Sequence, residues 1–235
     1  MAIASLYLIP VPLSDTSIDR VLPEWNITKI KEINFFIVEN VRSARRFLKK
    51  CDREIDIDAL TFFTLNQHTK PEEIASFLKP LEDGNNVGII SEAGCPAIAD
   101  PGADVVAIAQ RKKLKVVPLV GPSSILMSLM GSGFNGQSFS FQGYLPIDGM
   151  ERIKKFKEME TLINRYDQTQ IFIETPYRNN KLVAEMIKNL PKGMSLCIAS
   201  DISGEKEKII TRSIADWAKA NYDFDKVPTI FLLYK

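Results

Sequence analysis

Short apolar runs alternate with longer helical patterns through the first half of the chain, and this alternation constrains the fold most. The apolar runs predict buried strands at 3–9, 35–38, 60–65, 87–91 and 115–119. The patterns between them predict helices at 39–51, 71–82 and 102–113. Strands that alternate with helices of about a dozen residues are typical of βαβ units. The pattern therefore predicts a mainly parallel sheet.

The pattern changes after residue 147. Helices are predicted at 148–166, 177–190 and 214–220, and strands at 170–174, 195–201, 208–212 and 229–234. Consecutive strands without a helix between them indicate a mixed sheet. We therefore predict an α/β protein of two α/β domains, residues 1–146 and 147–235, with a mainly parallel N-terminal sheet and a mixed C-terminal sheet.

Composition argues against several classes of protein. Lys and Arg total 30 against 29 Asp and Glu, a formal net charge of +1, which disfavours a protein that coats a polyanion. Three widely spaced cysteines and the single histidine, His68, fit neither a disulfide framework nor a zinc site, so we expect no metal. The first residues lack the features of a signal peptide, and prolines and glycines interrupt the longest uncharged stretch, 116–147. We therefore expect a cytoplasmic chain without a membrane segment.

Three loops that follow predicted strands could carry a site: 10–15, 91–102 and 120–124. Open α/β sheets bind ligands beyond the carboxyl ends of their strands, and the small residues of these loops allow a ligand to approach the backbone. Each loop could equally be a turn that caps the next helix. No glycine-rich phosphate loop of the usual dinucleotide or nucleoside triphosphate type occurs in the chain.

The predicted helix at 39–51 has a basic face. Its basic residues, with one beyond its end, recur at helical spacing: Arg42, Arg45, Arg46, Lys49, Lys50 and Arg53. Such a face can follow the phosphates of a nucleic acid, although most basic faces are simply solvated. We treat these six residues as candidate RNA-binding residues.

Five segments, in order along the chain, resemble the tetrapyrrole methylase superfamily, whose members are S-adenosylmethionine-dependent methyltransferases of class III. The branch that is most similar 2′-O-methylates a cytidine of small-subunit ribosomal RNA. The resemblance covers nearly the whole chain. The segments are VENVRSARRF at 38–47, SEAGCPAIADPG at 91–102, PLVGPS at 118–123, FQGYLP at 141–146 and IETPYR at 173–178.

The resemblance implies a cofactor, S-adenosylmethionine, in the cleft between two α/β domains, and a homodimer. Carried over residue by residue, it implies cofactor contacts at Pro12, Leu13, Ala93, Gly94, Pro96, Ile98, Ser123, Ser124, Thr175, Pro176, Pro228 and Thr229. It also implies ribosomal RNA or the small ribosomal subunit as the partner.

The implied reaction moves a methyl group to a ribose hydroxyl, which requires a group that draws off the hydroxyl proton. The carboxylates in the site-forming segments are Glu39, Glu92, Asp100 and Glu174, and we select Glu39 and Asp100 as catalytic candidates. Two alternatives stay open. The acceptor could be a carbon atom of a tetrapyrrole, or the chain could be a degenerate paralogue that binds cofactor or RNA without turnover.

Overall fold

The computed structural model describes residues 3–66 and 69–235, so that His68 lies outside the described residues. The chain divides into two compact units, the first ending at Ser123 and the second beginning at Ser124. Within the described part of the chain, no helix has both the length and the apolar character needed to span a bilayer.

The first unit is built on a parallel five-stranded sheet with the order β3-β2-β4-β1-β5. Its strands are β1 (Ser5–Ile9), β2 (Phe35–Val38), β3 (Thr61–Thr64), β4 (Val87–Ile90) and β5 (Lys115–Pro118). The short apolar runs of the sequence predicted these strands to within a few residues. Since all five run in the same direction, their carboxyl ends lie at one edge of the sheet.

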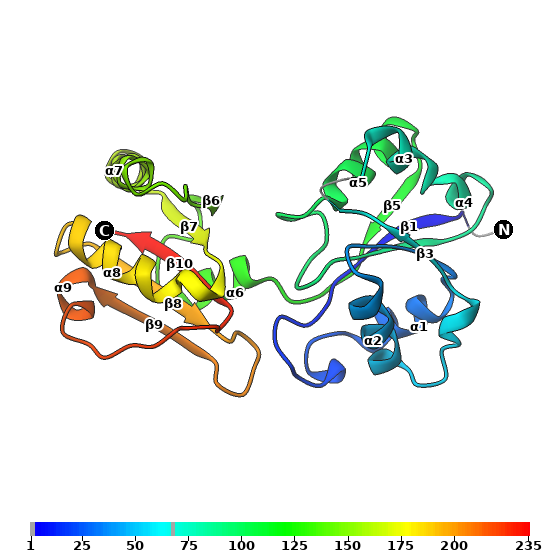
Figure 1. Ribbon diagram of the computed structural model, residues 1–235, viewed down its shortest axis with the longest axis horizontal. Coiled ribbons are helices and arrows are strands. Elements are labelled where there is room, and N and C mark those ends of the chain that lie inside the picture. Colours follow the sequence, from blue (N-terminus) through cyan, green and yellow to red (C-terminus); the bar gives the residue numbers. More distant parts are fainter. Residues whose placement is uncertain (1–2, 67–68) are drawn as a thin grey trace. The chain divides into compact units, whose positions relative to one another are not determined.

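Helices cover both faces of this sheet (Figure 1). The core on one face contains residues of α1 (Glu24–Lys31) and α2 (Val41–Cys51). The core on the other face contains residues of α3 (Pro71–Ser76), α4 (Lys79–Glu82) and α5 (Gly102–Arg111). Short 3₁₀ helices, η1 (Ile18–Arg20) and η2 (Ile57–Ala59), lie in the connections. This is the layered α/β arrangement that the sequence predicts.

The second unit is built on a mixed sheet with the order β6-β7-β10-β8-β9. Strand β6 (Phe139–Tyr144) is parallel to β7 (Thr169–Ile173), whereas β10 (Thr229–Tyr234) is antiparallel to β7 and to β8 (Ser195–Ser200). Strand β9 (Lys208–Ser213) pairs antiparallel with β8.

One core of the second unit joins this sheet to α7 (Gly149–Tyr166), α8 (Asn179–Asn189) and α9 (Ile214–Trp217). Helix α6 (Ser124–Ser132) packs against β9, since a Cβ on Gly131 would lie 2.8 Å from Ile209 Cδ1. A further 3₁₀ helix, η3 (Pro176–Arg178), precedes α8.

The structure corrects the predicted domain boundary and three elements. The division falls at 123/124 and not at 146/147, because α6 packs on the second sheet and β6 pairs with β7. The predicted helix at 71–82 is two helices, α3 and α4, because Pro80 cannot continue the hydrogen-bonding pattern of the preceding turn. Helix α1 and strand β6 were not predicted.

Candidate functional site

Three loops meet at the carboxyl edge of the first sheet. The loop after β1 and the loop after β4 are joined by two backbone hydrogen bonds. Val11 N donates to the carbonyl oxygen of Gly94 at 2.9 Å, and Gly94 N donates to the carbonyl oxygen of Val11 at 3.1 Å. The loop after β5 joins them through Pro122, whose carbonyl oxygen lies 3.4 Å from Cys95 Sγ.

Gly94 stands where these loops approach most closely. Its φ of 71° is in the left-handed region that favours glycine. A Cβ at this position would lie 3.1 Å from Leu13 Cδ2 and 3.6 Å from the carbonyl oxygen of Pro122. The tight junction therefore depends on the absence of a side chain at residue 94.

Asp100 holds the far part of the loop after β4. Its Oδ1 accepts hydrogen bonds from Gly102 N at 2.7 Å and from Ala97 N at 3.0 Å. Ala97 and Ala99 have φ values of 66° and 61°, so this network fixes a turn that alanine seldom adopts. Burial raises the pKa of Asp100, although the backbone donors oppose that shift. The contacts therefore give Asp100 a role in shaping the loop.

Glu39 follows β2 and supports the same loop. Its Oε1 accepts a hydrogen bond from Glu92 N at 3.2 Å. Burial raises the pKa of Glu39, and the negative charges of Asp100 and Glu92 add to this effect. Glu39 and Asp100 line one cavity of about 10 Å³, which is too small for a substrate.

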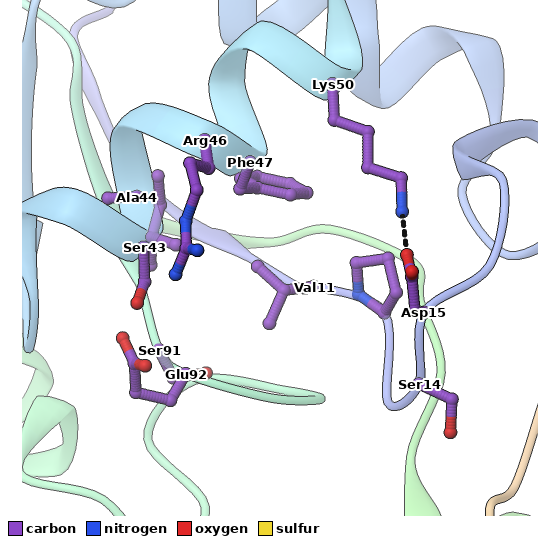
Figure 2. Close-up of a pocket in the computed structure, with 12 residues that line it drawn as sticks. Val11, Ser14, Asp15, Ser43, Ala44, Arg46, Phe47, Lys50, Ser91 and Glu92 are labelled. Carbon is purple, nitrogen blue, oxygen red and sulfur yellow. Dashed lines mark hydrogen bonds and ion pairs between the residues drawn. The ribbon is translucent and has the colours of Figure 1, made fainter. Parts of the chain in front are cut away.

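A much larger cavity, of about 400 Å³, lies between the loop after β1, helix α2 and the loop after β4 (Figure 2). Its wall on α2 includes Arg46 and Lys50, and its wall on the loop after β4 includes Ser91 and Glu92. Lys50 Nζ lies 2.8 Å from Asp15 Oδ1, which links helix and loop at the cavity. The remaining lining residues are Val11, Pro12, Ser14, Ser43, Ala44, Phe47 and Ile90. A cavity of this size is typical of sites for small molecules.

Helix α2 has the basic face that its sequence predicts. The side chain of Asn40 caps the helix by accepting from Arg42 N and Ser43 N, and Ala44, Phe47 and Leu48 are buried. The six basic candidates are exposed, five of them on the helix and Arg53 just beyond its end.

The members of this basic face differ in their contacts. Arg45 pairs with Asp58, and Lys49 Nζ donates to the carbonyl oxygen of Arg53 at 2.9 Å. Arg42 and Arg46 have side chains with no hydrogen bond or ion pair to any residue that the structure describes. These two guanidinium groups are therefore available to a ligand.

The candidates in the second unit gather at one edge of its sheet. Thr175 and Pro176 follow β7. Pro228 precedes β10 and Thr229 begins it, beside the end of β7, as the pairing of Ile173 with Ile230 requires. Lys226 N donates to the carbonyl oxygen of Pro176 at 3.2 Å, which joins the two segments.

A charged pair that the sequence reasoning missed lies at this edge. Glu174 Oε1 accepts from Arg178 Nη2 and from Thr175 N, both at 2.6 Å, and the Glu174 side chain is only 2% exposed. Asn179 reinforces the edge by donating to the carbonyl oxygen of Val227 at 2.8 Å.

The remaining candidates have simpler positions. Ala93 and Ile98 are exposed and Pro96 is buried in the loop after β4. Ser123 ends the first unit and Ser124 begins α6. Each unit thus brings its own share of the predicted cofactor residues together. Sequence reasoning missed Ser14, Asp15 and Ser43, which line the large cavity, because the contact between α2 and the loop after β1 is not a sequence pattern. Among the described residues, no group of three or more His, Cys, Asp and Glu side chains could hold a metal ion.

No family model matches the chain. It is 27% identical over 90% of its length to ribosomal RNA small subunit methyltransferase I of Vibrio cholerae. It is 30% identical over 78% of its length to the protein of that name from Streptococcus pyogenes, and 29% identical over 89% to the one from Bacillus subtilis. The chain is a homologue of these methyltransferases. It spans 69%, 60% and 63% of their respective lengths.

Solved structures of tetrapyrrole methyltransferases share the fold of this methyltransferase homologue. The methyltransferase CobJ matches all of the chain with a TM-score of 0.64 at 12% sequence identity. The uroporphyrin III C-methyltransferase of Thermus thermophilus matches 99% of the chain with a TM-score of 0.58 at 15% identity. The predicted α/β fold of the tetrapyrrole methylase type is therefore confirmed.

Proposed function

We propose that this chain transfers a methyl group from S-adenosylmethionine to a ribose 2′-hydroxyl of small-subunit ribosomal RNA in the cytoplasm. One structural observation supports the proposal independently of the homology. The loops that bear cofactor candidates, at Pro12 and beside Ser91, share a cavity with Arg46 and Lys50 of the basic helix. Elements suited to the cofactor and to an RNA acceptor are thus adjacent within one unit.

The proposed cofactor contacts in the first unit are Pro12, Leu13, Ala93, Gly94, Pro96, Ile98 and Ser123. Those in the second unit are Ser124, Thr175, Pro176, Pro228 and Thr229. The junction around Gly94 lies beyond a strand end, where open α/β sheets bind ligands, and its neighbour Ala93 is exposed. Ile98 is 54% exposed and offers apolar surface for an adenine ring.

The chemistry needs no metal. The acceptor oxygen attacks the methyl carbon in line with the departing sulfur, the C–S bond breaks with its electron pair on sulfur, and S-adenosylhomocysteine is released. The hydroxyl proton passes to a carboxylate. Glu39, whose pKa is raised by burial, is the candidate that we test for that role; because the cavity that it lines is too small for a substrate, Glu92 on the wall of the larger cavity is the alternative. Asp100, our second candidate, is already committed to two backbone donors.

The basic face of α2 supplies the proposed RNA contacts. Lys and Arg bind phosphates largely irrespective of sequence, so that each lost contact lowers the salt dependence of binding by roughly 0.7–0.9 in a log–log plot. The residues are Arg42, Arg45, Arg46, Lys49, Lys50 and Arg53.

We also propose a homodimer. Several large apolar side chains are exposed on α6 and near the start of α7: Leu126, Met130, Tyr144, Ile147 and Met150. Large exposed apolar side chains are frequent at protein interfaces. Light scattering should give twice the 26.5 kDa mass of the chain, and a mass of one chain at micromolar concentration would contradict the proposal.

The test of function is methyl transfer from labelled S-adenosylmethionine to small-subunit ribosomal RNA, followed by mass spectrometry of the nucleosides. We expect a 2′-O-methylated nucleoside that depends on the protein. The fold shared with tetrapyrrole methyltransferases makes C-methylation of a tetrapyrrole the second candidate, and uroporphyrinogen III is its test substrate. Cofactor binding by calorimetry without transfer to either substrate would instead identify a degenerate paralogue.

A further inference from the structure

We propose that the cavity of about 400 Å³ beside α2 is the binding site for a single nucleotide of the acceptor RNA, with Arg46 holding its phosphate. This inference rests on the proposed function and specifies the acceptor site within it. Of the six basic residues of this face, only Arg46 and Lys50 line the cavity, so the inference assigns them a role that the other four do not have.

The two walls of the cavity differ in charge. Arg46 and Lys50 lie one turn apart on α2, and Figure 2 shows the Arg46 side chain extending toward Ser91 and Glu92 on the other wall. A nucleotide has the matching polarity, with an anionic phosphate at one end and ribose hydroxyls that can donate to a carboxylate at the other. Ser14 and Ser43 add hydroxyl groups between these ends.

Arg46 is suited to a phosphate by its geometry and by its lack of partners. Its guanidinium makes no hydrogen bond or ion pair within residues 3–66 and 69–235. A planar guanidinium can bind a phosphate through two parallel hydrogen bonds, which are stronger than neutral ones. Lys50 differs, because Asp15 already holds its ammonium group at 2.8 Å.

The ion pair between Lys50 and Asp15 connects α2 to the loop after β1 only weakly. The Asp15 side chain is fully exposed, and an exposed ion pair contributes little to stability. A phosphate that arrives at the cavity can therefore compete with Asp15 for Lys50. The loop after β1 would be released from α2 by the same exchange.

Charge favours an RNA phosphate over the sulfonium of the cofactor at the α2 wall, although Pro12, a proposed cofactor contact, also lines the cavity. S-adenosylmethionine carries a sulfonium cation, which a wall with two cationic side chains disfavours. An RNA phosphate is an anion and is attracted to the same wall. Glu39 positions the opposite wall, because it accepts the hydrogen bond of Glu92 N.

The decisive experiment compares two arginines of one helix. Arg46→Gln and Arg42→Gln remove the same charge from exposed, unpaired side chains, but only Arg46 lines the cavity. Titration of cytidine 5′-monophosphate, followed by protein NMR, should show binding that is about tenfold weaker for Arg46→Gln, whereas Arg42→Gln stays within about threefold of the parent. Cytidine without phosphate should bind all three proteins equally weakly. Equal effects of the two substitutions would overturn the inference.

The Lys50–Asp15 ion pair allows a second comparison of two matched substitutions. Asp15→Asn frees Lys50 inside the cavity, and Asp58→Asn frees Arg45 outside it, from ion pairs whose carboxylates are 100% and 88% exposed. Asp15→Asn should tighten binding of the nucleotide by about threefold, and Asp58→Asn should leave it nearly unchanged. The reverse order would contradict the assignment of Lys50 to the cavity.

Transfer assays separate this inference from the proposed function. Ser43→Leu fills the cavity without changing charge, so methyl transfer should be lost while binding of S-adenosylhomocysteine and the melting temperature are retained. Retained transfer, or loss of S-adenosylhomocysteine binding in Arg46→Gln, would overturn the nucleotide site. Absence of transfer by the parent protein would instead refute the proposed function, and the titration of nucleotide still decides the site.

Discussion

The edges of the two sheets that carry the candidate residues are held together in different ways. At the edge of the first sheet, loops meet through backbone groups, as between Val11 and Gly94, and polar side chains such as Arg46 are left facing a cavity. At the edge of the second sheet, side chains add to the backbone hydrogen bond between Lys226 and Pro176, as Asn179 does with Val227 and Glu174 with Arg178.

Topology explains the difference. A parallel sheet gathers the ends of all its strands at one edge, so that several loops contact one another directly. In the mixed sheet the same edge contains the end of β7 and the start of β10, and the segments beside them are fixed by polar side chains. We therefore expect substitutions in the first edge to affect ligand binding and substitutions in the second to affect stability.

The largest expected effect is that of Gly94→Leu on cofactor binding. The new side chain would meet Leu13 and Pro122, and would separate the loops that we assign to the cofactor. Calorimetry should show affinity for S-adenosylhomocysteine reduced by more than about a hundredfold, or roughly 3 kcal/mol. Gly84→Leu is the control, because Gly84 also has a positive φ, of 91°, but has open space around its Cβ position. Unchanged binding in Gly94→Leu would remove this loop from the cofactor site.

The next effect concerns stability of the second unit. Arg178→Ala leaves the buried Glu174 carboxylate without its charged partner, which should lower the free energy of unfolding by about 2–3 kcal/mol, since Arg178 itself is partly exposed. Lys154→Ala breaks an exposed pair with Glu151 and should cost below about 1 kcal/mol. Urea denaturation measures both. Equal losses would show that the Glu174–Arg178 pair does not stabilise this edge more than a surface pair.

Sequence reasoning succeeded where periodicity determines structure. The alternation of strands and helices predicted the parallel sheet, and the spacing from Arg42 to Lys50 predicted one exposed basic face. It placed the domain boundary too late, because no strand was predicted at 139–144, which pairs with β7 of the second unit. The cavity could not be predicted, since it requires the tertiary contact between α2 and the loop after β1 that brings Lys50 to Asp15.

The smallest effect is the pH dependence due to Glu39, and it tests whether the first edge also carries a proton acceptor. Burial raises the pKa of Glu39 in the folded state, so between its unfolded and folded pKa values the folded protein binds more protons than the unfolded one. The contribution of Glu39 to the free energy of unfolding therefore falls as pH rises through that window. Glu39→Gln keeps an oxygen for Glu92 N but cannot ionise. Its stability relative to the parent should therefore increase as pH rises from the ordinary pKa of a glutamate through the raised one, by less than about 1 kcal/mol for a half-buried group.

The same substitution separates a catalytic from a structural role for Glu39. If Glu39 accepts the hydroxyl proton, the rate of methyl transfer by the parent should fall as pH drops through the raised pKa of this carboxyl, and Glu39→Gln should be slow at every pH. Glu24→Gln, which changes an exposed carboxylate on α1, is the control and should follow the parent in both measurements. If Glu39→Gln shows the predicted gain in stability but keeps the parent's pH–rate profile, Glu39 positions the Glu92 loop and takes no proton. The acceptor of the proton would then have to be sought at Glu92, the carboxylate on the wall of the nucleotide cavity.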